Sequence, residues 1–407
     1  MCGVVGYVGD RDCADVLVNG LSKLEYRGYD SAGIAVFDKG TIKVEKCKGR
    51  LLNLVEKIEQ EGKPHGHCGI GHTRWATHGE PSDINSHPHG NKRVTIVHNG
   101  IIENYKQIKD FLIDEGYSFV SETDTEIVAK LLDYYYVDDP VDTIIKVLSD
   151  IKGSYALGIM FRDYPDRIFA VRKDSPLIVG VGENENFIAS DVPAIINYTR
   201  DYYLLEQNEI AVVKKDSINV YNMHKEHIKK ELHTADWDVD AAEKGGYEHF
   251  MLKEIHEQPA VVRDTVSPRI VNNVPDFSSD NIDISKLKNY NKIFIVGCGT
   301  AMHAGMVGKY VIEKMARIPV IVDIASEFRY RDPLITENDL LIVISQSGET
   351  ADTLAVLRLA KEVNADTMAV VNVVGSSIAR EADMVVYTHA GPEISVASTK
   401  AYMVQIS

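Results

Sequence analysis

Short apolar runs separated by turn-forming residues dominate the chain up to about residue 235. Runs of this length, bounded by glycine, asparagine and aspartate, are typical of β-strands. We expect strands at residues 2–8, 32–37, 69–73, 94–98, 154–161, 168–171, 177–181 and 210–213. Apolar residues at helical spacing predict helices at residues 14–24, 103–115 and 125–136. Because the strands largely follow one another and the helices come in separate blocks, the pattern favours an α+β fold with antiparallel sheets.

The pattern changes near residue 292, where short apolar runs begin to alternate with helical segments. We expect strands at residues 293–296, 319–323, 340–344 and 368–373, with a helix from about 301 to 315. This alternation predicts an α/β doubly wound parallel sheet, whose ligands bind at the carboxyl ends of the strands. Between the two patterns we expect a helix at 249–258 ended by Pro259, then a surface segment of little periodicity at 266–290.

Length, charge and cysteine usage narrow the class of protein. The 407 residues are too many for one ordinary core and indicate two or three domains. A formal charge of −16 argues against a nucleic-acid partner. We find neither a signal-peptide pattern nor an apolar stretch that could span a membrane, and the five scattered cysteines form no Cys-x-x-Cys pair. We therefore expect a cytoplasmic enzyme with free thiols.

Cys2 directly follows the initiator methionine and becomes the N-terminal residue when Met1 is removed. Its α-amino group, with a pKa of about 7.7–8.0, is partly neutral near neutral pH. A neutral amine beside a thiol forms a nucleophile with an adjacent base. Taken alone, however, Cys2 is better interpreted as a small residue at the start of a buried strand than as a nucleophile.

Three polar clusters interrupt the apolar pattern, at residues 72–79 with 86–89, at 98–100 and at 122–126. Each has a plain structural interpretation. Asn99-Gly100 after a strand is typical of a hairpin turn, and Asp124 could cap the helix that follows. The histidines show no ligand spacing typical of zinc, so we expect no metal site.

Taken together, five ordered motifs resemble the class II glutamine amidotransferase domain. They are Cys-Gly-Val-Val-Gly, Tyr-Arg-Gly-Tyr-Asp-Ser, Gly-His-Thr-Arg-Trp-Ala-Thr-His-Gly, His-Asn-Gly-Ile-Ile-Glu-Asn and Glu-Thr-Asp-Thr-Glu. The resemblance covers residues 2–218. It implies the N-terminal-nucleophile fold, in which two antiparallel sheets lie between helical layers (αββα).

The resemblance also implies roles for individual residues. Cys2 would attack the side-chain amide of glutamine, and Arg27 would orient its surroundings. The Asn99 side-chain amide and the Gly100 backbone N–H would stabilise the tetrahedral oxyanion. The implied glutamine-binding residues are Arg74, Trp75, Thr77, His78 and Asp124. Among these, the Arg74 fork suits the substrate carboxylate and the Asp124 anion its ammonium group, whereas His87 could be structural or could support the site.

Two motifs mark the second half. Gly297-Cys298-Gly299 is a weak dinucleotide signal, because His303 stands where the third glycine is expected. Ser345-Gln346-Ser347-Gly348-Glu349-Thr350 opens a helix after an apolar strand. Hydroxyls and helix N-terminal N–H groups together predict a phosphate cradle, whereas an ordinary helix cap would need only one of the hydroxyls.

These motifs, with Val-Ala-Ser-Thr-Lys at 396–400, resemble a sugar isomerase (SIS) domain over residues 285–407, after a connecting segment at 219–284. The resemblance implies sugar-phosphate-binding residues Thr300, Ser345, Gln346, Ser347, Thr350 and Val396. Ala301 departs from the serine that many members carry there. A class II glutaminase followed by SIS resembles the isomerising glutamine–fructose-6-phosphate aminotransferases. That implies glutamine and fructose 6-phosphate as substrates, no cofactor, no membrane or nucleic-acid partner, and a homodimer formed through the SIS half.

The family also has a second SIS domain and a C-terminal tail, which contribute a Schiff-base lysine, an isomerising glutamate and a ring-opening histidine. The chain stops at Ser407 within an expected helix, so we expect either a fragment of the enzyme or part of a longer chain. A fragment should make glutamate without amino sugar. The alternative is a glutaminase coupled to a non-catalytic sugar-phosphate sensor. Amidotransferases that use a pyrophosphate acceptor are disfavoured, because such a substrate calls for basic residues or a metal.

Overall fold

The computed structural model describes residues 2–25, 28–75, 79–235, 245–283 and 285–407. The chain divides into two compact units, residues 1–236 (unit 1) and 237–407 (unit 2). Each unit has its own sheets and its own apolar core, and each is described by itself.

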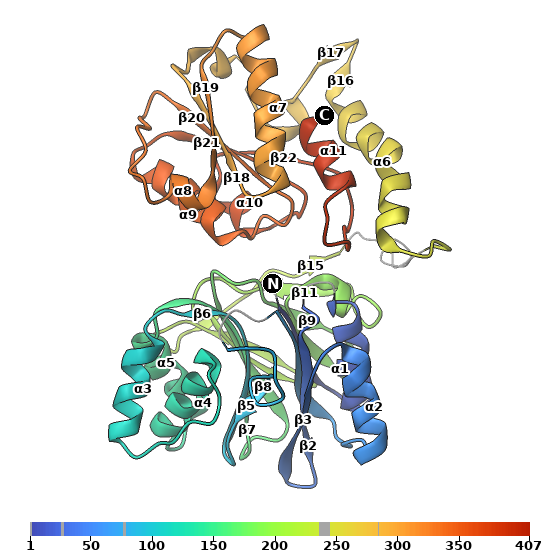
Figure 1. Ribbon diagram of the computed structural model, residues 1–407, viewed down its shortest axis with the longest axis vertical. Helices are drawn as coiled ribbons and strands as arrows, with labels where there is room; N and C mark the ends of the chain where they lie inside the picture. The colour runs from blue at the N-terminus through green and yellow to red at the C-terminus, as the bar shows by residue number, and fades with distance from the viewer. Residues whose placement is uncertain (1, 26–27, 76–78, 236–244, 284) are drawn as a thin grey trace. The chain divides into compact units, whose positions relative to one another are not determined.

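Unit 1 contains two antiparallel sheets (Figure 1). The eight-stranded sheet has the order β15 (His233–Thr234), β11 (Asp201–Leu204), β9 (Ile178–Val181), β10 (Asn186–Ala189), β1 (Gly3–Val8), β4 (Cys68–Arg74), β2 (Ser31–Asp38) and β3 (Thr41–Lys48). The seven-stranded sheet has the order β14 (His227–Ile228), β13 (Ile218–Tyr221), β12 (Ile210–Lys214), β8 (Arg167–Lys173), β7 (Gly153–Phe161), β6 (Val94–Ile102) and β5 (His89–Gly90).

Helices cover the outer face of each sheet, as Figure 1 shows. Helices α1 (Cys13–Ser22) and α2 (Leu51–Glu61) pack on the eight-stranded sheet, and α4 (Asp124–Tyr135) packs on the seven-stranded one between α3 (Tyr105–Asp114) and α5 (Pro140–Asp150). The inner faces meet in one core, where Val4 and Ile70 of one sheet pack with Val97 and Ile168 of the other. The expected two-sheet architecture between helical layers is therefore confirmed.

The hairpin turn considered at Asn99-Gly100 is wrong, because β6 continues through both residues to Ile102. Gly100 has φ +135°, and a Cβ there would lie 2.0 Å from the Ser154 carbonyl oxygen on β7. Only glycine tolerates this conformation and this close approach, so the residue keeps the strand running rather than ending it.

Unit 2 is built on a five-stranded parallel sheet, which confirms the doubly wound prediction. Its order is β19 (Val320–Ile324), β18 (Ile293–Gly297), β20 (Leu340–Ser345), β21 (Asp366–Val371) and β22 (Met384–Tyr387). The helices among these strands are α7 (Thr300–Met315), α8 (Ala325–Phe328), α9 (Ala351–Glu362) and α10 (Ser377–Glu381). The strand order reverses between β18 and β20, which is where such sheets bind ligands.

Helix α6 (Phe250–Val266) runs through Pro259, so the predicted end of this helix is wrong. A proline inside a helix costs about 3 kcal/mol. Tertiary packing offsets that cost, since Val261 is buried against α11 (Lys400–Ile406) in a small apolar cluster. Beyond α6, residues 266–290 form 3-10 turns (η4 Ser267–Arg269, η5 Ser278–Asp280, η6 Lys286–Asn289) and a hairpin of β16 (Ile270–Val271) and β17 (Val274–Pro275).

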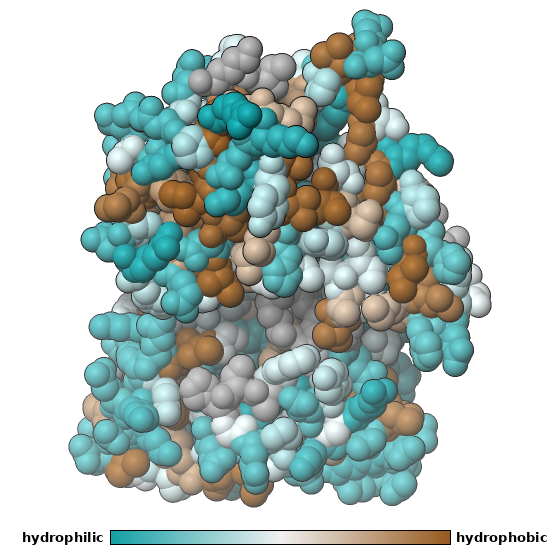
Figure 2. Space-filling model, turned by 45° about the horizontal axis from the view of Figure 1, so that its top comes forward, coloured by the Kyte–Doolittle hydropathy of each residue, from teal (hydrophilic) through white to brown (hydrophobic). Residues whose placement is uncertain are grey.

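Unit 2 exposes apolar side chains next to polar ones, and these brown side chains gather over it in Figure 2. On α7 the exposed apolar residues include Met306, Val307, Val311 and Met315. Within the described residues, no helix is both long and apolar enough to cross a bilayer.

Candidate functional site

Cys2 directly precedes β1, beside the end of β4. The Trp75 backbone N–H donates to Cys2 Sγ at 3.1 Å, and the Trp75 carbonyl oxygen lies 3.5 Å from the same sulfur. The β1–β4 register, in which Gly3 pairs with Thr73, places the thiol next to Arg74 and Trp75. The Trp75 ring is partly exposed and packs edge-on against Tyr29, with ring centroids 5.4 Å apart.

Asn99 of β6 contacts Cys2 directly. Its Nδ2 donates to the Cys2 carbonyl oxygen at 2.8 Å and to Ser190 Oγ at 3.0 Å. Ser190 is itself held to β1, because its Oγ accepts from the Val4 N–H at 2.8 Å. Ser190 could not be identified from the motifs, because it belongs to none of them and reaches the site through the pairing of β1 with β10.

Two opposite charges are buried near the thiol. Arg74 ends β4 with a 3% exposed side chain, and its guanidinium donates to the Gly79 carbonyl oxygen at 3.0 Å. Burial lowers the pKa of Arg74, and the charges of Cys2, Asp124 and Asp30 oppose that shift. The Arg74 guanidinium therefore interacts electrostatically with the thiol of Cys2 and with both carboxylates.

Asp124 is the first residue of α4 rather than its cap, so the capping interpretation is wrong. Thr123 is the N-cap, and its side chain accepts from the Glu126 N–H. The Asp124 carboxylate instead accepts the Ile102 backbone N–H at 2.8 Å and thereby joins the helix to the end of β6.

Behind Asn99 lie four buried histidines: His72, His87, His89 and His98. His72 Nε2 is 2.9 Å from Asn99 Oδ1, and His72 Nδ1 is 3.2 Å from His87 Nδ1. Burial lowers the pKa of His72 to about 3 and lowers the pKa values of His87 and His89 well below the ordinary range. His87, whose role was open, thus lies in a polar layer behind the site, and His72 and His98 were missed although both are part of the motifs.

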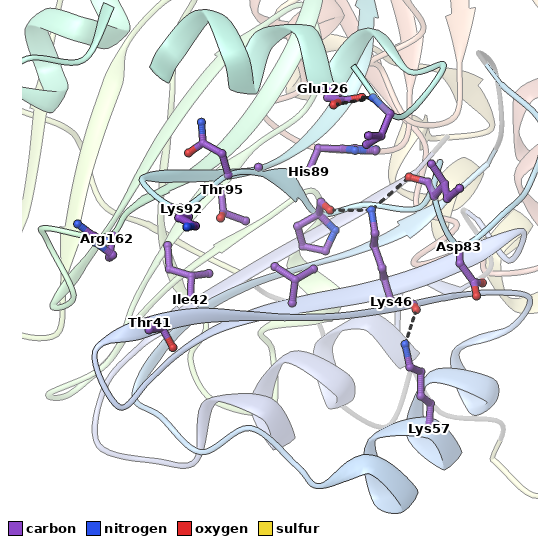
Figure 3. A pocket seen from close by; sticks show the side chains of 16 residues that line it. Thr41, Ile42, Lys46, Lys57, Asp83, His89, Lys92, Thr95, Glu126 and Arg162 are labelled. Carbon is purple, nitrogen blue, oxygen red and sulfur yellow. Dashed lines mark hydrogen bonds between the residues drawn. The ribbon is translucent and has the colours of Figure 1, made fainter. Parts of the chain in front are cut away.

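Lys46 of β3 fixes the segment that carries His87. Its Nζ donates to the carbonyl oxygens of Ile84 (3.2 Å), Ser86 (2.7 Å) and Pro88 (3.2 Å). Figure 3 shows Lys46 among the residues that line the neighbouring cavity. Burial lowers the Lys46 pKa to about 8. The side chain lines a cavity of about 810 Å³ between β3 and β5, whose lining does not include Cys2.

Three predicted residues, Arg27, Thr77 and His78, lie outside the described residues. Among the residues that are described, no group of three or more His, Cys, Asp or Glu side chains is placed to hold a metal ion.

The phosphate-cradle motif of unit 2 forms a tight loop between β20 and α9. Ser345 Oγ accepts the Gly348 N–H at 3.0 Å and lies 3.1 Å from Thr350 Oγ1. Gly348 has φ +65°, and a Cβ there would lie 2.0 Å from Ser376 Oγ. Because β18 and β20 pair in parallel, with Gly297 opposite Ile344, Thr300 and this loop follow neighbouring strand ends.

Val396 lies on a different loop, residues 393–399, and is 70% exposed. Glu254 of α6 holds this loop: its carboxylate accepts the Ile394 N–H at 2.6 Å, the Ser395 N–H at 3.1 Å and the Ser395 hydroxyl. The sequence did not identify Glu254 as part of the site.

Comparison with known proteins agrees with these two units. A model described as a glutamine amidotransferase domain matches residues 72–197, and one described as an SIS domain matches residues 286–407. The B. subtilis glutamine phosphoribosylpyrophosphate amidotransferase, solved with ADP and GMP, aligns with a TM-score of 0.51 at 16% identity, over 100% of this chain and 92% of that one. At that identity the likeness concerns the fold alone.

Curated relatives match from end to end of this chain. The isomerizing glutamine–fructose-6-phosphate aminotransferases of Clostridium tetani and Clostridium acetobutylicum are each 60% identical to it over 410 residues. Each alignment covers 100% of this chain and 67% of the relative. The chain belongs to the family of isomerising glutamine–fructose-6-phosphate aminotransferases.

Proposed function

We propose that this protein releases ammonia from glutamine at Cys2 and binds fructose 6-phosphate in unit 2, the two halves of glucosamine 6-phosphate synthesis. The observation that carries the proposal is that the partly exposed Cys2 meets the buried residues Asn99, Arg74 and Asp124. Each of these groups matches one requirement of a glutamine amide hydrolase.

The chemistry begins with attack of Cys2 Sγ on the glutamine amide carbon. After removal of Met1, the Cys2 α-amino group takes the thiol proton and passes it to the departing ammonia. The Asn99 side-chain N–H and the Gly100 backbone N–H stabilise the oxyanion. Water then hydrolyses the thioester through a second oxyanion, which releases glutamate and frees the thiol.

Substrate orientation follows from charge. The Arg74 guanidinium offers a planar fork to the glutamine α-carboxylate, and the Asp124 carboxylate pairs with the α-ammonium group. By the family resemblance, we assign Trp75 to the cover over the thiol. By the family resemblance, we assign Thr77 and His78 to the same binding site and Arg27 to orientation of the nucleophile.

In unit 2 we assign the sugar-phosphate site to the loop at the switch point of the sheet. The phosphate accepts hydrogen bonds from hydroxyls and backbone N–H groups at the start of α9, without a cationic side chain. The residues proposed to bind the sugar phosphate are Thr300, Ser345, Gln346, Ser347, Thr350 and Val396.

Incubation with glutamine, with and without fructose 6-phosphate, tests the proposal through glutamate release and amino-sugar formation. Cys2→Ala should abolish glutamate release with an unchanged circular dichroism spectrum. Cys298→Ala, which removes another partly exposed thiol, should leave glutamate release intact. Wild-type glutaminase activity in Cys2→Ala would refute the assignment of Cys2 as the nucleophile.

We also propose that the protein forms a homodimer through unit 2. The exposed apolar residues Met306, Val307, Val311 and Met315 on α7 support this proposal, since large apolar patches mark association surfaces. Light scattering on wild type and on Val307→Lys/Val311→Lys tests it: the wild type should have the mass of a dimer, and the variant that of a monomer. A monomeric wild type would contradict the proposal.

A further inference from the structure

Four buried polar side chains behind Asn99 have no role in the proposed chemistry. They are His98 on β6, Thr125 on α4, His87 on the segment before β5, and His72 on β4. Each is at most 6% exposed. Together they form one row of hydrogen bonds that ends at the Asn99 side chain.

The positions of the hydrogens in this row follow from one unambiguous acceptor. His72 Nε2 faces the His98 backbone carbonyl oxygen at 3.1 Å and Asn99 Oδ1 at 2.9 Å, so Nε2 must carry the hydrogen. In a neutral ring Nδ1 then has the lone pair, and it must accept from His87 Nδ1–H at 3.2 Å.

The same reasoning continues away from Asn99. His87 Nε2, left with a lone pair, accepts from the Thr125 hydroxyl at 2.8 Å. Having donated its only hydrogen, Thr125 Oγ1 must accept from His98 Nδ1–H at 3.0 Å. Every donor in the row therefore points toward Asn99. Burial, which lowers the pKa values of His72 and His87, keeps both rings neutral as this arrangement requires.

The row decides which way the Asn99 amide is turned. An N–H on His72 demands an oxygen from Asn99, so the amide NH₂ group faces the other side, toward the Cys2 carbonyl and Ser190 Oγ. A flipped amide would put N–H against N–H at His72 and oxygen against oxygen at Cys2. That flip would also remove the donor that the oxyanion requires.

We propose that His72, held as its Nε2–H tautomer by His87 and Thr125, is a positioning residue that keeps the Asn99 amide donor turned toward Cys2. The inference rests on the proposed function and deepens it, since it explains how the nearly isosteric O and NH₂ ends of the Asn99 amide are held in one orientation. Lys46 supports the row from outside, because it holds the carbonyl groups on both sides of His87.

Kinetics of matched variants test the proposal. His72→Gln can keep an N–H near the Nε2 position, whereas His72→Leu cannot. We expect His72→Leu to lower kcat for glutamine hydrolysis by about 10- to 100-fold with KM changed less than about twofold, and His72→Gln to restore most of kcat. Alkylation of Cys2 by iodoacetamide, which forms no oxyanion, should proceed at the wild-type rate in both variants.

Thr125→Val and Thr125→Ser give a second, nearly isosteric pair in case His72→Leu does not fold. The valine variant should lose kcat and the serine variant should keep it. Equal activity of His72→Leu and wild type, or equal losses in His72→Leu and His72→Gln, would overturn the proposal. Equal kcat in the two Thr125 variants would overturn it as well.

Nitrogen NMR of protein labelled with ¹⁵N-histidine tests the row without any activity. We expect His72 as the Nε2–H tautomer and His87 and His98 as Nδ1–H, with signals assigned from single-histidine variants. The Nε2–H tautomer at His87 would overturn the inference, even in a fully active enzyme. Absence of glutamate release by the wild type would instead overturn the proposed function. The NMR result would then still test the arrangement of hydrogen bonds in the row.

Discussion

Acidification should destabilise unit 1, because its buried histidines are neutral in the folded state. The size of the effect can be worked out for His72. The side chain has 0% exposure, and burial lowers its pKa to about 3. In the unfolded chain the same ring titrates near about 6.5. Above that pH both states are neutral and His72 contributes nothing to the pH dependence. Below about pH 6.5 the His72 ring binds a proton in the unfolded state but not in the folded state, so the free energy of unfolding falls as the pH falls.

Integrating from about pH 6.5 down to about pH 5, at about 1.4 kcal/mol per pH unit, gives a loss of about 2 kcal/mol from His72 alone. The loss stops growing near pH 3, where the folded ring also protonates. His87 and His89 are buried in the same way and add losses of the same sign. The wild-type protein should therefore lose more than the single-residue figure.

Hydrogen exchange by mass spectrometry measures the effect within the full chain. Peptides from β6 and β7 report the opening free energy of unit 1 at neutral pH and at about pH 5, after correction for intrinsic exchange rates. In His72→Gln, which has no titrating ring, the difference between the two pH values should shrink by about 2 kcal/mol relative to wild type. An unchanged difference, or an NMR titration of His72 near its ordinary pKa, would refute the reasoning.

Three further changes should act through single contacts. Gly33→Ala places a Cβ 2.1 Å from the His87 carbonyl oxygen and should lower the free energy of unfolding by about 1–3 kcal/mol in urea titrations; an unaffected variant would contradict the packing described. Ser347→Ala should weaken fructose 6-phosphate binding about tenfold by calorimetry, and unchanged affinity would exclude its hydroxyl from the phosphate site. Glu254→Gln removes one acceptor from the 393–399 loop and should weaken sugar-phosphate binding without changing glutaminase activity; equal effects on both would contradict a local role.

The parts of the fold that could be predicted from sequence are those in which local pattern and burial agree. Strands such as β7 and β20 are apolar over nearly their whole length, because both faces are covered, and both were found. Strand β3 was missed because it lies at a sheet edge and is mostly exposed, so its polar sequence resembles a loop. Helix α6 was cut short because the cost of Pro259 can be weighed only against packing that the sequence does not display.

The same distinction applies to the site. The motifs predict Cys2, Arg74, Asn99 and Asp124 as site residues, and the structure brings these four residues close together. The supporting residues could not be found in this way. His72 contacts His87 across 15 positions, and Asn99 contacts Ser190 across 91, because separate strands bring them together. Only the stacking of the layers decides such contacts.

The edges of the two sheets in unit 1 have a consequence for aggregation. Within the described residues, three of the four edge strands (β15, β14 and β5) are two residues long, too short to template pairing with another chain. The fourth, β3, is eight residues long but carries Lys43, Glu45, Lys46 and Lys48. An incoming strand would have to bury several of these charges, and Lys46 is already bound to the carbonyl groups of the neighbouring segment. Substitutions that make β3 apolar should therefore be avoided in engineering this protein, because they would convert this long edge of unit 1 into a site for fibril growth.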